Sequence, residues 1–226
     1  MRVLVTLAAA ASLATSAWAG TIIAAGSPLG SGLTISGGAS IFSSVATAAA
    51  GFVLPAGANY TLDDAQVLLT FDGEANPINL TAQLFADTSG NPSGSALVSF
   101  SNSGICPCAN GAVVDATLTP QSAFTLLASH TYWLALEAIG SDRNIAWEAT
   151  TTSNPYTGIA TYAGSRRSST YPATESLPST SQVNLIFAID ATQVVVGGVP
   201  EPATAGLAGL GVLGLVWVKR RGSRVY

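Results

Sequence analysis

Few side chains in this 226-residue sequence could do covalent chemistry near neutral pH. His130 is the single histidine, and the sequence holds neither a Gly-x-Ser-x-Gly elbow nor a His-Glu-x-x-His motif. His130 precedes an aromatic-rich stretch, where a hydrogen-bonded turn histidine is far more common than a catalytic one. Adjacent acids such as Asp63 and Asp64 are typical of solvated turns. We therefore expect no catalytic residue and no enzyme; an extracellular hydrolase, the least favoured alternative, would require two carboxylates across an open groove.

Two cysteines are the other reactive residues. Cys106 and Cys108 are separated only by Pro107, in a loop rich in Asn, Ser and Gly. A disulfide between them is conceivable in an oxidising compartment, but so small a ring is strained and easily reduced. The alternatives are a mixed disulfide, inert thiols, covalent attachment to a partner, or a metal site, which would need two further ligands. The spacing favours a strained or mixed disulfide or inert thiols, and no metal site is predicted.

Two other groups of side chains could bind small ligands. Hard oxygens occur in turns at residues 72–74 and at Asp87 with Asn91, which makes a structural calcium ion conceivable, although neither turn has EF-hand spacing. Trp147 and Tyr156 offer flat rings that could stack on sugars. Trp147 lies in an apolar stretch, so we expect it to fill the core instead. Apart from the calcium alternative, the sequence predicts no cofactor.

The segment 1–19 is typical of a secretory signal peptide. A positive residue and an apolar run over residues 3–13 precede Ala17 and Ala19, which give the small-x-small cleavage pattern. The apolar run is shorter than the roughly 20 residues that a spanning helix needs. We therefore predict cleavage before Gly20 and export of the remaining chain.

The carboxyl-terminal segment 199–226 combines a Pro-Glu-Pro tripeptide, an apolar run over residues 203–218 and a basic end over residues 219–224. Proline resists helix formation and cations stay on the cytoplasmic face of a membrane. This order predicts one transmembrane helix, with the preceding chain outside the cytoplasm. The residues of the signal are Val199, Pro200, Glu201, Pro202, Lys219, Arg220 and Arg221.

This three-part order resembles the PEP-CTERM sorting signal. The resemblance implies that an exosortase-type membrane protease cuts near Pro-Glu-Pro. It also implies an inner-membrane intermediate, followed by release to the cell surface or extracellular matrix of a Gram-negative bacterium. The apolar run of residues 203–218 is shorter than a comfortable permanent span, which favours transient insertion, with a plain single-pass anchor as the alternative. Residues 193–198, with two glycines, would form a flexible spacer before the signal.

The exported part is acidic and poor in charge. Charged residues make up 9% of the chain, against roughly 25% in an average soluble protein. Between Gly20 and Gly198, three arginines face eleven acidic side chains, a formal net charge of −8. Because this sign repels phosphate backbones, nucleic acid is not an expected partner.

The middle of the chain has the pattern of an all-β domain. Strand-like runs recur at short intervals between residues 39 and 198, with Gly, Pro or Asn between them and no helical stripe. We predict a domain over residues 46–192, a jelly-roll-like β-sandwich of about eight or nine antiparallel strands. Residues 20–45 would be an exposed leading segment or first edge strand, and residues 155–182 a long surface excursion.

Several motifs of this domain resemble the exported β-domains named choice-of-anchor, the R type above all. They are Ala-Gly-Phe-Val-Leu at residues 50–54, Leu-Thr-Ala-Gln-Leu-Phe-Ala-Asp at 80–87, Gly-Asn-Pro-Ser-Gly at 90–94 and Thr-Tyr-Trp-Leu at 131–134. The resemblance implies a body that is separable from its attachment signal, and it implies no catalytic residue.

These features together predict an exported, non-enzymatic protein of the cell surface or extracellular matrix. Its role would be structural or adhesive in exopolysaccharide or biofilm. Its expected partners are an exosortase-type protease, the membrane before processing, and extracellular polysaccharide. A carbohydrate-binding module is the alternative, and it requires Trp147 or Tyr156 to be exposed in a groove.

Overall fold

The computed structural model of the chain describes residues 18–26, 30, 39–40, 47–71, 80–101, 111–138, 145–168 and 184–195. Nearly all of them belong to one compact body, Ala17–Val194. The predicted signal-peptide run, the spacer beyond Val195 and the sorting signal lie outside the described residues. Within the described part of the chain, no helix is long and apolar enough to cross a membrane.

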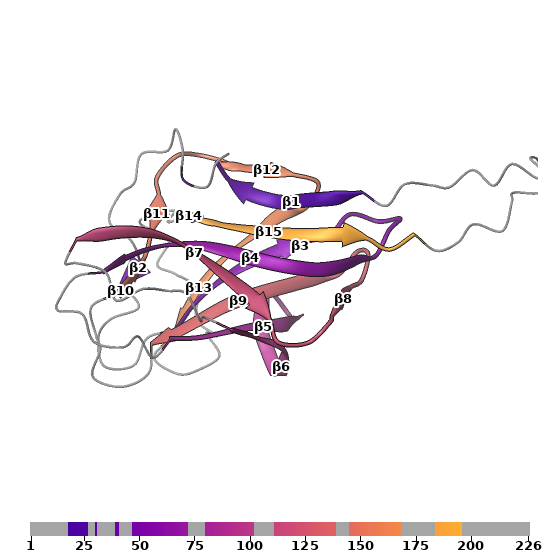
Figure 1. The fold of residues 1–226 in the computed structure, drawn as a ribbon, viewed down its shortest axis with the longest axis horizontal. Coiled ribbons are helices and arrows are strands. Elements are labelled where there is room, and N and C mark those ends of the chain that lie inside the picture. Colours follow the sequence, from indigo (N-terminus) through magenta and orange to yellow (C-terminus); the bar gives the residue numbers. More distant parts are fainter. Residues whose placement is uncertain are drawn as a thin grey trace, which may run out of the picture. The chain divides into compact units, whose positions relative to one another are not determined.

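All regular structure in the described residues is β-strand, which confirms the predicted all-β class (Figure 1). The strands are β1 (Ala19–Ala25), β2 (Ala39–Ser40), β3 (Thr47–Val53), β4 (Tyr60–Phe71), β5 (Leu80–Thr88), β6 (Asn91–Ser101), β7 (Ala112–Pro120), β8 (Thr125–Leu126), β9 (Thr131–Ala138), β10 (Ile145–Trp147), β11 (Ala149–Thr150), β12 (Tyr156–Gly158), β13 (Thr161–Ser168), β14 (Asn184–Leu185) and β15 (Phe187–Gln193).

Ten of these strands form one continuous antiparallel path in the order β12-β1-β15-β4-β7-β6-β5-β9-β3-β13. The path is nearly closed and barrel-shaped, because its two end strands, β12 and β13, follow each other in the chain and approach in space. There the rings of Tyr156 and Tyr162 stack with their centroids 4.1 Å apart. Halfway along, β6 and β7 are joined by only two residue pairs, Phe100 with Pro120 and Ser101 with Thr119.

This architecture differs from the predicted sandwich of two separate sheets with eight or nine strands. Alternation of apolar and polar residues predicts that a strand buries one face. It does not show whether those faces belong to two sheets or to one sheet that curls around the core. The short pairing between β6 and β7 marks where the curled path comes closest to dividing into two five-stranded halves.

Two predicted segments also differ from the structure. The segment expected to be an exposed or edge strand begins with β1, which lies between β12 and β15 and buries Ile22 and Ile23 completely. The predicted surface excursion begins with β12 and β13, the two strands that nearly close the barrel. Both stretches are rich in Gly, Ser and Thr, whose small side chains hide the period-two signal.

The core is built from inward-facing aliphatic and aromatic side chains of both halves of the path. Val67 and Leu69 on β4 and Leu134 on β9 are fully buried. Phe187 packs edge-on against Trp147, with centroids 6.5 Å apart and planes at 83°. Burial of each large apolar side chain stabilises the fold by about 1.5–3 kcal/mol.

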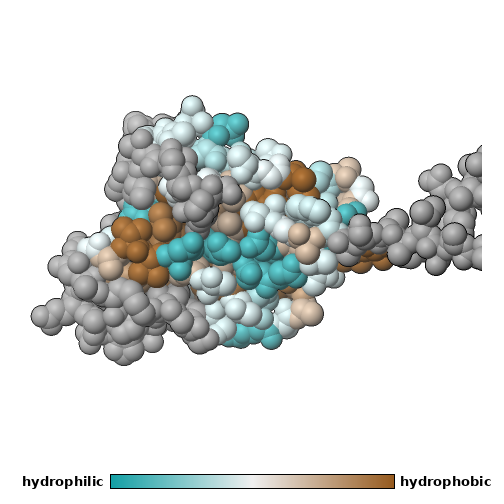
Figure 2. All heavy atoms as spheres, turned by 45° about the horizontal axis from the view of Figure 1, so that its top comes forward, coloured by the Kyte–Doolittle hydropathy of each residue, from teal (hydrophilic) through white to brown (hydrophobic). Residues whose placement is uncertain are grey.

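The outer surface is mixed rather than uniformly apolar. One face shows a hydrophilic band between separate hydrophobic patches (Figure 2). The large apolar side chains exposed among the described residues are scattered over several strands and turns: Trp18, Leu97, Val113, Leu127 and Ile159.

Candidate functional site

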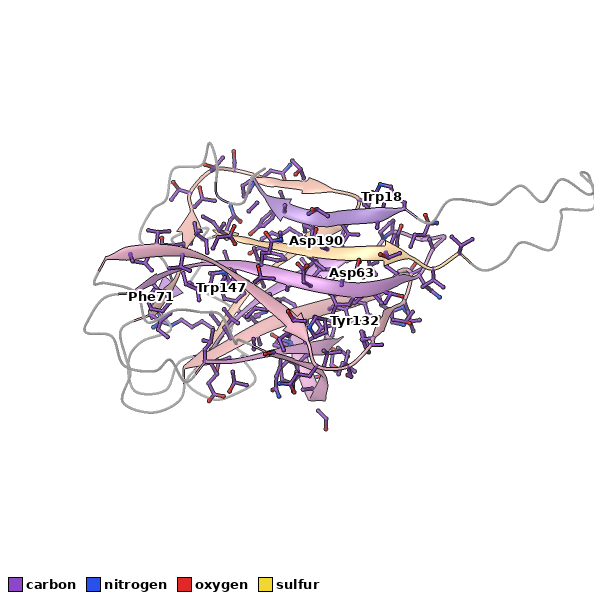
Figure 3. All side chains as sticks on the ribbon, viewed as in Figure 1. Trp18, Asp63, Phe71, Tyr132, Trp147 and Asp190 are labelled. Carbon is purple, nitrogen blue, oxygen red and sulfur yellow. The ribbon has the colours of Figure 1, made fainter. Side chains whose placement is uncertain are left out.

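The start of the first strand, β1, lies beside the end of the last strand, β15. In β1 and β15, which are antiparallel neighbours, Ala19 pairs with Thr192 and Gly20 pairs with Ala191. The backbone N–H of Gln193 donates to the carbonyl of Trp18 at 2.7 Å. Trp18 therefore lies at the end from which β15 continues, and Phe71 lies at the opposite end (Figure 3). We call residues 18–20, Asn59 and residues 193–194 the tail junction.

Asn59 holds the tail junction through both its backbone and its side chain. Its carbonyl accepts the N–H of Val194 at 2.8 Å, and its side-chain Oδ1 accepts the N–H of Ala128 at 2.9 Å. The second bond ties the turn before β9 to the place where β15 ends. These hydrogen bonds hold the chain to the body as far as Val194.

The predicted signal-peptide cleavage site meets this junction. Ala17 lies outside the described residues, while Ala19 and Gly20 are the first residues of β1. The bond between them lies within the ladder of β1 with β15. Trp18, which precedes Ala19, is 43% exposed. The sequence alone could not show this pairing, because β1 and β15 are the first and the last strands along the described chain.

Several predicted site residues fall outside the described residues. These are the sorting-signal residues Val199, Pro200, Glu201, Pro202, Lys219, Arg220 and Arg221, the pair Cys106 and Cys108, and the turn acids Asp72 and Glu74.

His130 is a turn residue, as the sequence predicts. Its Nδ1 lies 2.8 Å from the carbonyl oxygen of Ala128, and its exposed ring stacks on Tyr132 at 6.4 Å between centroids. Among the residues the structure describes, no group of three or more His, Cys, Asp or Glu side chains could hold a metal ion.

The turn at Asp87 and Asn91 is held by protein donors. Asp87 Oδ1 accepts the indole N–H of Trp133 at 2.8 Å, and its Oδ2 accepts the N–H of Gly90 at 3.1 Å. Asn91 Oδ1 accepts the Nε–H of Arg166 at 3.0 Å. These three side-chain oxygens all accept hydrogen bonds from groups of the protein itself.

The two candidate sugar-binding aromatics point into the protein. Trp147 is fully buried, and its Nε1 donates to the carbonyl of Ile186 at 2.9 Å, in agreement with the core-filling interpretation. Tyr156 stacks on Tyr162, and its hydroxyl donates to the carbonyl of Leu185 at 2.7 Å. Burial raises the pKa of Tyr156 far above its usual range. Neither ring offers the exposed platform that the carbohydrate-binding alternative requires.

The adjacent acids Asp63 and Asp64 have different settings. Asp63 is exposed beside an irregularity in the ladder and accepts the hydroxyl of Thr192 at 2.8 Å. Asp64 pairs across the ladder with Asp190 of β15, a partner that sequence reasoning missed. Burial, and then the charge of Asp190, raise the pKa of Asp64. Asp64 and Asp190 are direct neighbours on paired strands. A hydrolase would instead need two carboxylates that face each other across an open groove.

Comparison with known proteins bears on the tail. Residues 198–221 match the PEP-CTERM protein-sorting motif, which confirms the resemblance stated for this part of the sequence. The motif implies processing by an exosortase and sorting to the cell surface. No curated protein matches the chain. The match does not reach the body, whose resemblance to choice-of-anchor domains stays a prediction. The chain is therefore an exported all-β protein that carries a PEP-CTERM sorting signal.

Proposed function

We propose that this protein is a non-enzymatic structural or adhesive component of the cell surface or exopolysaccharide matrix of a Gram-negative bacterium. The observation that carries the proposal is the sorting motif at residues 198–221, which begins shortly after the body ends at Val194. An exosortase-type protease would cut near Pro-Glu-Pro and release or transfer the intact body.

The properties of the body support a structural role. Its described side chains form a dense apolar core, and its oxygens and rings that could have bound ligands are engaged in internal hydrogen bonds and stacking. A matrix component needs a stable fold and a hydrated surface more than it needs a cleft. The acidic, charge-poor surface would keep such a body apart from anionic lipid and nucleic acid.

Cell fractionation tests the sorting step. Deletion of residues 199–226 should move the protein from the surface and matrix fractions to the periplasm or medium. A matched variant, in which Pro200, Glu201 and Pro202 are changed to Ala and the apolar run is kept, should accumulate in the inner membrane, because insertion needs only the helix and its cations. Unchanged surface localisation of the truncated protein would overturn the sorting claim.

Mass spectrometry of the mature carboxyl terminus tests the cut. Protein recovered from the surface should end near residues 200–202 and lack Lys219, Arg220 and Arg221. Recovery of an intact basic end on surface protein would instead show a plain single-pass anchor.

A further inference from the structure

Asp64 and Asp190 form a close pair on the outer face of the barrel. They lie directly opposite each other in the ladder of β4 with β15, and their chain neighbours Ala65, Ile189 and Ala191 are buried in the core. Gln66, also on β4, donates from Nε2 to Asp190 Oδ2 at 3.1 Å. Asp190 lies in the middle of its strand beside Asp63 (Figure 3).

Each carboxyl group of this pair has one oxygen without a partner. Asp64 Oδ1 and Asp190 Oδ1 are both shielded from solvent, and neither has a hydrogen-bond partner. Two ionised carboxylates in this position would repel each other and leave both oxygens unpaired. One proton between the two oxygens would make a charge-assisted O–H···O bond and satisfy both.

No positive charge in the described neighbourhood offsets the pair. Strands β1, β4, β7 and β15 carry no Lys, Arg or His. From β1, the residue that pairs with Asp190 is Thr21, which is uncharged. The other acids on these strands are Asp63, which bonds Thr192, and Asp115 on β7, which lies opposite Leu68 further along β4. In the unprocessed chain Gly20 has no α-ammonium, so every charge on these four strands is negative.

We propose that Asp64 and Asp190 share one proton and act as a pH-sensitive clamp between β4 and β15, the strand that leads to the sorting tail. A raised pKa of Asp64, which burial and Asp190 cause, agrees with this arrangement. A folded-state pKa above the ordinary value of 3.8 means that the clamp is complete in acid below that value. Its contribution is lost as the pH rises through the raised pKa. The ladder beside the pair, which shifts register between Asp190 and Ala191, would loosen first.

Thermal unfolding of the full-length chain in mild detergent, at pH 3.5 and pH 7.5, tests the clamp. Asp64→Asn replaces the shared proton with a permanent amide N–H donor, and Asp190→Asn does the same from the other side. Each variant should raise the Tm at pH 7.5 by roughly 2–4 °C, and the difference from the natural chain should vanish at pH 3.5. The double variant should gain no more than either single one.

Hydrogen exchange locates the effect. At pH 7.5 the peptide over residues 187–195 should exchange faster in the natural chain than in Asp64→Asn, while the peptide over residues 131–138 should not differ. Comparison at one pH removes the intrinsic pH dependence of exchange.

Asp115→Asn is the matched control, because Asp115 lies on the adjacent strand β7 and has no facing carboxyl group. It should shift the Tm less than either variant of the pair. The proposal is overturned if Asp64→Asn and Asp190→Asn lower or leave unchanged the Tm at pH 7.5. An equal gain at both pH values, or an equal gain from Asp115→Asn, would overturn it as well. These outcomes do not depend on where the protein is sorted.

Discussion

Trp133, on the outer face of the barrel, lies in a small cluster of side chains that is separate from the main core. Trp133 is fully buried although it points away from the main core, in a second apolar cluster with Ala49 and Phe85. Gly51 makes room for it, since a Cβ there would lie 2.8 Å from the indole ring. The guanidinium of Arg166 lies 4.9 Å from the centre of the same ring and closes the cluster.

Arg166→Ala should lower the free energy of unfolding by about 1–2 kcal/mol, because the cation–π contact and the bond to Asn91 are both lost. Arg166→Lys keeps the charge over the ring but not the fixed Nε donor, so its loss should be smaller. Urea unfolding followed by tryptophan fluorescence measures both variants. Equal stability of all three proteins would show that the guanidinium adds nothing to this cluster.

Local sequence context predicts where some of the candidate side chains lie, but it does not predict the partners of others. The positions of His130 in a turn and Trp147 in the core follow from local context, since one precedes a strand and the other sits in an apolar stretch. The roles of Asp190 and Arg166 depend on partners that are distant in the chain, Asp64 and Asn91. No local pattern reports such pairings, and so the acidic pair was not predicted.

At the level of elements, long strands were easier to predict than short ones. β4 has twelve residues, and β9 is a run of aromatic and aliphatic residues, so both carry a strong strand signal. β12 has three residues and β1 seven, mostly small, so their propensity signal is weak. Tertiary pairing of β1 with both β12 and β15 gives these segments their strand conformation.

The pairing of β1 with β15 predicts an order of processing. Proteases bind their substrates as unpaired, extended chain, and the bond between Ala19 and Gly20 lies in a ladder. Folded full-length precursor in detergent should therefore be cut by signal peptidase at least tenfold more slowly than precursor diluted from urea. That ratio corresponds to roughly 1.4 kcal/mol for opening the end of β1.

Insertion of a short flexible Gly-Ser segment after Ala19 supplies the control, because it moves the scissile bond out of the ladder without touching Gly20 or β15. The folded insertion variant should be cut as fast as the unfolded one. Equal rates for the folded and unfolded natural precursor would contradict the order of events.

At the scale of the whole described body, the approach of β12 to β13 is what distinguishes the nearly closed barrel from the predicted sandwich. The stacked rings of Tyr156 and Tyr162 lie at this closure, and both rings also approach Phe187 in the core. The class of fold followed from strand periodicity. The closure did not, because it depends on how far the sheet curls and on two short strands in a Ser- and Thr-rich stretch.

Two substitutions of Tyr162 separate the ring from its hydroxyl. Tyr162→Ala should lower the free energy of unfolding by about 2–4 kcal/mol, because it removes a partly buried ring from the closure. Tyr162→Phe should change it by less than about 1 kcal/mol, because the hydroxyl is buried without a hydrogen-bond partner. Chemical unfolding of both variants gives these values, and a similar large loss for Phe would mean that the hydroxyl stabilises the closure.

The shared end of β1 and β15 has a mechanical consequence for a body held by its tail. Tension that enters at Val194 and leaves at the opposite end, near Phe71, runs parallel to β15. β15 has a paired neighbour on each side, β1 and β4, so the pull would shear two ladders at once. Many hydrogen bonds would then have to break together, whereas a strand peeled from an edge breaks them one by one. A protein that resists cell detachment would gain from this direction of load.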